Sequence, residues 1–161
     1  MMKWVFLIIV ILILLIVFVS NFILNATFIK NNKWYDKIGH KMMNPDNFTT
    51  TKTKYDIIEE NQKNLGYEFW DSANYEDIYL KTDKGKLYAR EFLQEHSNKW
   101  AILVHGYRKT GKEDMSFYGL NFYSKGFNVL IPDLFAHGKS DGNKIGMGWS
   151  DRLDICLWID E

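Results

Sequence analysis

Cysteine and net charge are what this 161-residue sequence has least of. Cys156 is the only cysteine, so an intrachain disulfide framework is excluded and cysteine usage does not indicate a compartment. Twenty Lys and Arg residues balance twenty Asp and Glu residues, which leaves no strong electrostatic field for nucleic acid. No group of His, Cys and Asp residues has metal-ligand spacing, and we therefore expect no metal site.

A long apolar run occupies the N-terminus. Residues 4–19 are apolar without interruption, and residues 22–24 continue the run after two polar residues. A helix rises about 1.5 Å per residue and the hydrocarbon core is about 30 Å thick, so residues 1–24 are long enough to cross a bilayer. A cleaved signal is the main alternative and a buried core helix a lesser one, but the run exceeds the usual signal core of about 7–15 residues. We therefore expect an uncleaved, single-pass anchor with the lipid bilayer as its partner.

The sequence gives opposing indications of the side of the membrane on which the rest of the chain lies. A positive-inside count favours the cytoplasm, because four lysines follow the anchor, namely Lys30, Lys33, Lys37 and Lys41. Long domains translocate largely regardless of such charges, and an N-terminal signal-anchor commonly keeps its short tail inside. We favour the cell-surface face, and the cytoplasmic face stays open.

Two regions are expected after the anchor. Residues 25–66 are rich in Lys, Asn and Thr and form the expected juxtamembrane stalk. Helical spacing over residues 55–65 predicts a short helix within it that ends at Gly66. Residues 67–161 form the expected domain.

Four strands are predicted in this domain. Residues 75–81 and 87–93 alternate in polarity and are joined by an Asp- and Gly-containing turn, which predicts a β-hairpin. Residues 100–104 form a continuous apolar run, typical of a strand buried on both faces of a parallel sheet. Residues 127–131 predict a second buried strand, stopped by Pro132.

Two helices complete the pattern. The first covers residues 113–125, with one apolar stripe formed by Met115, Tyr118 and Phe122. The second opens at Ser150, a good N-cap, and its first turn carries two acidic residues that suit the positive end of the helix dipole, Asp151 and Asp154. The order hairpin, strand, helix, strand, helix predicts a parallel strand pair, a right-handed crossover and an α/β layer fold.

Ligand sites in open α/β sheets lie beyond the carboxyl ends of the strands. There, residues 106–112 match the phosphate-loop pattern G-x4-G-K, but Glu113 stands where that motif needs Ser or Thr. Residues 138–142 match the nucleophile elbow G-x-S-x-G, in which the serine sits on a turn directly between strand and helix. The next helix starts some eight residues after Gly142, so Ser140 is better explained as a polar turn residue.

Three segments taken together resemble the α/β-hydrolase family, namely residues 102–107, 128–133 and 136–142. Residues 146–158 resemble a membrane-anchored bacterial branch of that family, related to serine-aminopeptidase-like hydrolases. The resemblance covers about residues 75–161 and implies the first half of the family's sheet, an antiparallel hairpin followed by β-α-β-α. It implies a complete form that is a serine hydrolase, cleaving an ester or amide through an acyl-enzyme without a cofactor.

The resemblance also implies roles for individual residues. The backbone N–H of Tyr107, with Gly106 beside it, would supply half of the oxyanion hole. His105 would orient this loop and would not be the triad base. Asp133 and His137 would brace the loop after the fourth strand, although turn residues of these types commonly bond local backbone without any functional role.

The family's catalytic groups are the part that this sequence lacks. The family order is Ser, then Asp or Glu, then His, with the serine after the fifth strand, whereas the chain stops in the helix before that strand. We expect no nucleophile, acid or base, an inactive fragment, and an exposed apolar edge at residues 100–104. Two alternatives are a non-catalytic membrane-anchored lobe that binds a partner through this edge, and one half of a split hydrolase.

Overall fold

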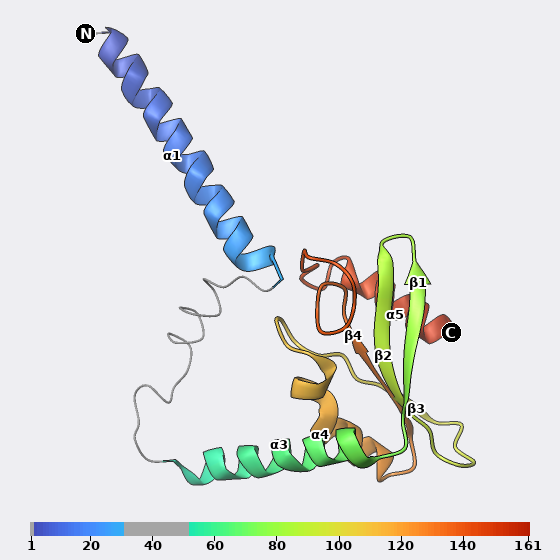
Figure 1. Ribbon diagram of the computed structural model, residues 1–161. Coiled ribbons are helices and arrows are strands. Elements are labelled where there is room, and N and C mark those ends of the chain that lie inside the picture. The colour runs from blue at the N-terminus through green and yellow to red at the C-terminus, as the bar shows by residue number, and fades with distance from the viewer. Residues whose placement is uncertain (1, 31–51) are drawn as a thin grey trace.

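The computed structural model describes residues 2–30 and 52–161 and places an α/β domain beside the end of a long N-terminal helix (Figure 1). The elements are, in chain order, α1 (Met2–Phe28), α3 (Lys54–Ser72), β1 (Glu76–Thr82), β2 (Gly85–Phe92), β3 (Trp100–Ile102), α4 (Gly111–Tyr123), β4 (Asn128–Asp133) and α5 (Asp151–Asp160). Half of the predicted stalk, residues 31–51, lies outside the described residues.

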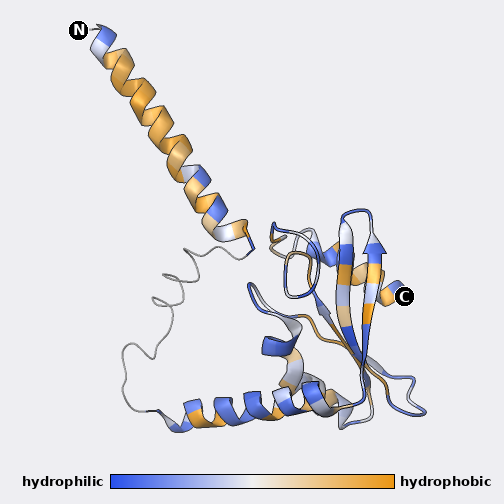
Figure 2. Ribbon diagram, in the orientation of Figure 1, coloured by the Kyte–Doolittle hydropathy of each residue, from blue (hydrophilic) through white to orange (hydrophobic). Residues whose placement is uncertain are grey.

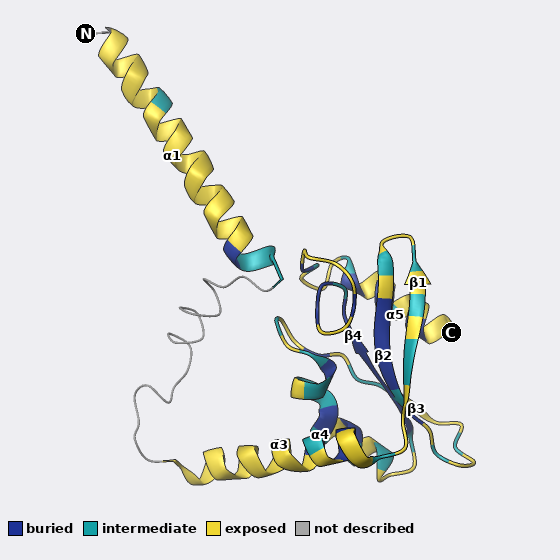
Figure 3. Ribbon diagram, viewed as in Figure 1, coloured by how far each residue is buried: buried dark blue, intermediate teal, exposed yellow. Residues whose placement is uncertain are grey.

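Helix α1 has the dimensions and the surface of a membrane-spanning helix. Its 27 residues extend about 40 Å at 1.5 Å per residue, whereas the hydrocarbon core is about 30 Å thick. Apolar residues surround it over most of its length (Figure 2), and nearly all of them are exposed (Figure 3). Among the described residues, this one helix is long and apolar enough to cross a membrane, a property that anchors share with signal sequences.

Helix α3 is longer than its sequence pattern predicts. It begins at a capping box, in which the Thr53 hydroxyl accepts the Asp56 N–H and the Asp56 carboxylate accepts the Thr53 N–H. The predicted end at Gly66 is wrong, because α3 continues to Ser72. Gly66 is buried where α3 crosses α4, and a Cβ there would lie 2.5 Å from the backbone nitrogen of Phe117. This glycine therefore permits a close helix crossing.

The strands form one mixed sheet in the order β1-β2-β4-β3. The hairpin is confirmed, since β1 and β2 are antiparallel and Ile78 lies opposite Ala89. β2 is antiparallel to β4, and β4 is parallel to β3, the two strands that flank α4 in the chain. The predicted α/β class, with a hairpin followed by a parallel strand pair that flanks a helix, is confirmed, and an apolar helix stands where the transmembrane helix is predicted.

The two parallel strands differ in burial. All six residues of β4 are buried, and the strand continues through Pro132, which lies opposite Ala89, so the predicted stop at Pro132 is wrong. β3 has only three residues and lies at the edge of the described sheet. Trp100 is 48% exposed, so the prediction that residues 100–104 are buried on both faces is wrong. The expectation of an exposed edge is the one that fits β3.

Helices cover both faces of the sheet (Figure 1). On one face, Phe69 and Trp70 of α3 form a buried cluster with Phe92, Val129 and Ile131 of the sheet, and α4 packs against this cluster. On the other face, Trp158 of α5 packs against Leu87, Ala89 and Leu130. The alternation of Val129, Leu130 and Ile131 between the two clusters follows the two-residue period of a strand.

Helix α4 buries small residues. Its buried residues are Gly111, Ser116 and Gly119, and a Cβ on Gly119 would lie 2.9 Å from the Ile131 Cδ1 atom. Tyr118 is 54% exposed, so the predicted stripe of large apolar residues is wrong at this position. The close approach of α3 on one side and β4 on the other leaves room only for small side chains.

Candidate active site at the strand carboxyl ends

A cavity lies where β3 and β4 end. Its volume is about 380 Å³, within the range of small-molecule sites. The lining comes from the loop after β3 (Val104, His105, Gly106, Tyr107), the loop after β4 (Leu134, His137, Ile145, Met147, Gly148) and α5 (Asp151, Arg152, Ile155). This is the position at which open α/β sheets bind ligands.

His105 joins the two loops. It is buried, and its Nε2 atom accepts the N–H of Leu134 at 3.0 Å. Because a backbone N–H can only donate, the ring hydrogen must lie on Nδ1, which donates to the Gly106 carbonyl at 2.8 Å. His105 therefore holds the start of each loop as a neutral imidazole, the kind of contact that the predicted orienting role requires.

His137 makes the reciprocal connection. Its Nε2 atom accepts the N–H of Arg108 at 3.3 Å, and its Nδ1 atom donates to the Phe135 carbonyl at 3.0 Å. Burial lowers the pKa of His137, and the neighbouring ring of His105, 4.8 Å away between centroids, acts in the same direction. Both histidines are thus committed to backbone groups, which fits bracing and leaves neither ring nitrogen of His137 directed at a nucleophile.

Asp133 ties the loop after β4 to the start of α4. One carboxylate oxygen accepts the Gly111 N–H at 2.7 Å and the other accepts the Lys139 N–H at 2.9 Å. Gly138, the residue before Lys139, has φ of +42°, and a Cβ there would lie 1.8 Å from the Asp133 carboxylate. Glycine is therefore needed at position 138 for both the backbone angle and the contact.

Ser140 is part of the same brace. Its side chain is buried, and its hydroxyl donates to the Asp133 carbonyl at 2.6 Å and accepts the Tyr88 N–H at 2.8 Å. The hydroxyl thereby bridges Tyr88 and Asp133, the last residue pair between β2 and β4. A serine that is buried and bonded to backbone in this way is a turn residue, as the spacing indicates, and not an exposed nucleophile.

The loop after β3 turns sharply at the cavity wall. The Gly106 carbonyl accepts the Lys109 N–H, and Arg108 at the third position of the turn has φ of +56°. An arginine in the left-handed region is strained, and such strain is held by surrounding contacts. The Gly106 N–H is bonded to the Asp114 carboxylate at 2.7 Å. Gly106 and Tyr107 both line the cavity, and the role of the Tyr107 N–H as an oxyanion donor stays a prediction.

The phosphate-loop hypothesis does not fit these contacts. Lys112, the residue that would reach phosphate, instead binds both carboxylate oxygens of Asp71 on α3 at 2.7 and 2.8 Å. Glu113 caps α4 by accepting the backbone N–H and the hydroxyl of Thr110. Lys112 and Glu113 are therefore both engaged in contacts within the protein. Among the described residues, no group of three His, Cys, Asp or Glu side chains could hold a metal ion.

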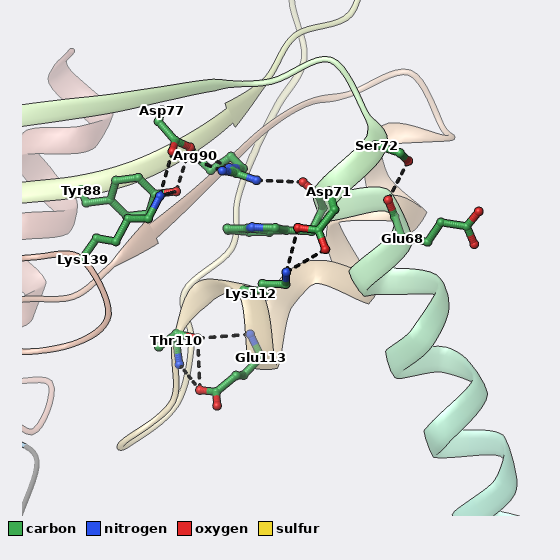
Figure 4. Close-up of polar contacts among 11 residues, drawn as sticks. Glu68, Asp71, Ser72, Asp77, Tyr88, Arg90, Thr110, Lys112, Glu113 and Lys139 are labelled. Atoms are coloured by element: carbon green, nitrogen blue, oxygen red, sulfur yellow. Dashed lines mark hydrogen bonds and ion pairs between the residues drawn. The ribbon is translucent and has the colours of Figure 1, made fainter.

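A polar network fixes the far side of the loop after β4 (Figure 4). Asp77 on β1 accepts bonds from Arg90 at 2.7 and 3.2 Å, from Tyr88 at 2.8 Å and from Lys139 of the loop at 2.8 Å. Burial alone would raise the pKa of Asp77, but the hydrogen bonds from Arg90, Lys139 and Tyr88 outweigh it and hold this pKa well below its usual value. Burial and the bond to Asp77 raise the pKa of Tyr88 to about 12.

Two features of the site were not predicted from sequence. Asp151 is 3% exposed and lines the cavity, and only one of its carboxylate oxygens has a hydrogen-bond partner, the Gly148 N–H at 2.8 Å. The sequence predicted that Asp151 lies in the first turn of a helix, where it suits the helix dipole, but did not predict that it lines a cavity. The available sequence signal was Gly146, because a Cβ there would lie 2.2 Å from the Asp151 carboxylate.

The second feature is the attachment of α1 to the site loops. The Arg108 guanidinium donates to the Ala26 carbonyl at 2.7 Å and to the Ile29 carbonyl at 2.9 Å. The Tyr107 hydroxyl donates to the Thr27 carbonyl at 2.5 Å. Ile29 also pairs with Lys144 of the loop after β4 in an antiparallel bridge. The carbonyls at the end of α1, which lack partners within the helix, are therefore bonded by the loops that wall the cavity.

Several solved structures are similar to this chain. An esterase from Pyrococcus furiosus is 27% identical, with a TM-score of 0.50, over 58% of this chain and 36% of its own. The thioesterase domain from the curacin biosynthetic pathway is 21% identical, with a TM-score of 0.43, over 54% of this chain and 33% of its own. An alpha-beta hydrolase from Vibrio vulnificus is 19% identical, with a TM-score of 0.45, over 61% of this chain and 34% of its own.

The match is therefore partial. The chain spans about a third of the length of these solved structures, 33–36%. No protein-family model matches the sequence. No curated protein matches it either. The similarity to the esterase identifies the α/β-hydrolase type of fold.

Proposed function

We propose that this chain is the N-terminal part of a membrane-anchored serine hydrolase, whose complete form cleaves an ester or amide through an acyl-enzyme. The observation that carries this proposal is the loop after β3, which brings Gly106 and Tyr107 to the wall of a cavity at the strand carboxyl ends. The partial likeness to an esterase supports the same class of reaction. The membrane-anchored bacterial branch that the sequence resembles is part of the proposal.

The Tyr107 N–H is the proposed contribution of this chain to catalysis. In acyl transfer, negative charge develops on the former carbonyl oxygen, and a preorganised backbone donor stabilises it. Such a donor is worth about 2.7–4 kcal/mol of transition-state stabilisation. His105 and His137 keep the loop in place as positioning residues, because their ring nitrogens bond its backbone and that of the neighbouring loop.

The nucleophile, the acid and the base are assigned to sequence outside these 161 residues. Ser140 is bonded to backbone on both sides, and His105 and His137 are committed to backbone groups. On this proposal the chain alone is inactive, and an added C-terminal part, in the same chain or as a separate half, restores the triad.

The anchor is the second part of the proposal. Helix α1 crosses the bilayer once, and the domain lies on the cell-surface side. Protease treatment of intact cells tests the orientation, because the lysine-rich residues 30–54 are cleaved only if they are outside. Protection in intact cells with cleavage after lysis would place the domain in the cytoplasm.

A non-catalytic role is favoured by one observation, the exposed edge of the sheet. β3 has no neighbour on one side in the described sheet, and Trp100 is 48% exposed there. An edge strand of this kind pairs readily with another chain. A lobe that binds a partner through β3 is therefore the second candidate.

Labelling with a serine-reactive phosphonate separates the two candidates. The coding sequence downstream of residue 161 is determined in all frames, and any segment with a strand, G-x-S-x-G and later Asp and His is expressed with the chain. We expect no labelling of the chain alone and strong labelling of the combination. No such segment, or no labelling of the combination, would leave the partner-binding lobe ahead.

A further inference from the structure

The end of α1 is fixed to the domain by contacts of several kinds. Beyond the Arg108 and Tyr107 bonds to its carbonyls, the Phe28 carbonyl accepts the Ile145 N–H at 2.7 Å and the Lys30 N–H donates to the Asn143 carbonyl at 2.8 Å. The Lys30 ammonium group donates to the carbonyls of Gly138 and Ser140 at 3.1 and 3.0 Å. Both loops that form the cavity wall are thus attached to the point where the apolar helix ends.

This attachment sets the distance between the cavity and a bilayer. The apolar run ends at Leu24, and Ile29 follows five residues later, which is about 8 Å along a helix. The headgroup layer on each side of the hydrocarbon core is about 5–8 Å thick. With α1 in a bilayer, the loops bonded to residues 26–30 therefore lie at headgroup depth, and so does the cavity between them.

The side chains at the cavity suit that depth. Tyr107 and Met147 line the cavity and are 40% and 52% exposed, and Trp149, which follows the cavity residue Gly148 in the chain, is 76% exposed. The Arg152 guanidinium lies 4.0 Å from the centre of the Trp149 ring. Exposed Trp and Tyr next to basic side chains are typical of proteins in the membrane interface, where aromatic rings sit at headgroup level and cations meet anionic lipid.

We infer that this surface, the interfacial rim formed by Tyr107, Lys144, Met147, Trp149 and Arg152, docks onto the headgroup layer of the bilayer that α1 enters. The cavity then opens toward lipid, and its ligand is an amphiphile that reaches it from the membrane. The identity of that ligand as an ester or amide rests on the proposed hydrolase activity. The docking of the rim rests on the proposed membrane span of α1.

Depth-resolved fluorescence quenching tests the docking on the full-length chain. Met147→Cys carries a fluorophore in a Cys156→Ser background, and the protein is placed in nanodiscs of phosphatidylcholine with some phosphatidylglycerol. Nitroxide lipids quench either at the headgroup or deep in the acyl chains. The matched control is Glu95→Cys, because residue 95 is exposed and lies between β2 and β3, at the opposite end of the sheet.

We expect headgroup nitroxides to quench the label at position 147 severalfold more than the label at position 95. Equal quenching at both positions, or none at 147, would overturn the inference and leave the rim for water or a protein partner. Arg108→Gln, which removes the guanidinium that binds the end of α1, is expected to reduce quenching at 147. The comparison of positions 147 and 95 remains decisive even if that variant folds poorly.

The test is independent of catalysis. If the label at position 147 is quenched but the phosphonate labels no completed form, the hydrolase proposal is refuted and the docking of the rim is supported. If the phosphonate labels a completed form but the label at position 147 is not quenched, the docking of the rim is refuted and the hydrolase proposal is supported.

Discussion

Replacing Asp77 with Asn removes one negative charge from the centre of the polar network that joins β1, β2 and the loop after β4. Asp77 accepts two bonds from Arg90, whose side chain is 6% exposed, and a further bond from Lys139. Removing one member of a buried ion pair costs about 3–5 kcal/mol. Asp77 is itself 28% exposed, and Arg90 keeps its bond to the Trp70 carbonyl at 2.8 Å, so the expected loss is smaller, about 2–3 kcal/mol.

Urea unfolding of the full-length chain in detergent measures this loss. At neutral pH, Asp77→Asn should lower the free energy of unfolding by about 2–3 kcal/mol and the melting temperature by about 10 °C or more. The control is Glu60→Gln, which breaks the exposed Lys52–Glu60 pair and should cost less than about 1 kcal/mol. If both variants lose the same small amount, the network does not stabilise the fold as argued.

The pH dependence gives a second test of the same residue. The folded-state pKa of Asp77 lies below the ordinary value of 3.8, so its stabilisation is complete above that value and is lost as pH falls through the folded-state pKa. The difference between the native chain and Asp77→Asn should therefore stay constant from neutral pH to about pH 5 and shrink below about pH 4. A difference that disappears near pH 6 would contradict this assignment.

Three other substitutions have defined outcomes. Gly66→Ala places a Cβ against Phe117 and should cost about 1–3 kcal/mol in urea unfolding, whereas Asn61→Ala on the exposed face of α3 should be nearly neutral. Tyr107→Pro removes the proposed oxyanion donor and should lower kcat of the completed enzyme by about 10²–10³, whereas Tyr107→Phe keeps the N–H and most of the rate. Equal kcat values for the two variants, at equal melting temperatures, would refute the role of the Tyr107 N–H as an oxyanion donor. Burial lowers the pKa of His137, so the contribution of His137 to the free energy of unfolding is complete above the ordinary pKa of 6.5 and falls as the pH drops below that value. His137→Gln should flatten this dependence of the free energy of unfolding on pH. An unchanged dependence would exclude His137 as its source.

Local sequence patterns predicted those parts of the fold that depend on neighbours along the chain. The hairpin follows from alternation, and the buried strand β4 from its mostly apolar residues. The start of α5 after Ser150 was also located, although the Ser150 side chain makes no capping hydrogen bond, so its predicted role as an N-cap is wrong. The site loops were found in the same way, because strand ends can be located from sequence. In the structure, His105 and Asp133 bond the backbone of the adjoining loops.

Features that depend on contacts between distant elements were not predicted. Gly66 has the sequence appearance of a helix end, but its function is set by α4, about fifty residues away in the chain. Tyr118 fits an apolar stripe, yet the approach of α3 and β4 gives the buried face to small residues. The bonds from Arg108 to the end of α1 join residues 79 and 82 positions apart, and no local pattern encodes them.

Mapping the site of phosphonate attachment tests the central claim most directly. The completed protein is treated with the phosphonate, digested, and analysed by mass spectrometry, with Ser140→Ala as the control. We predict one adduct on a serine beyond residue 161, retained in Ser140→Ala, and no adduct on residues 1–161. An adduct on Ser140, or no adduct on any completed form, would contradict the assignment of this chain as the nucleophile-free part of a serine hydrolase.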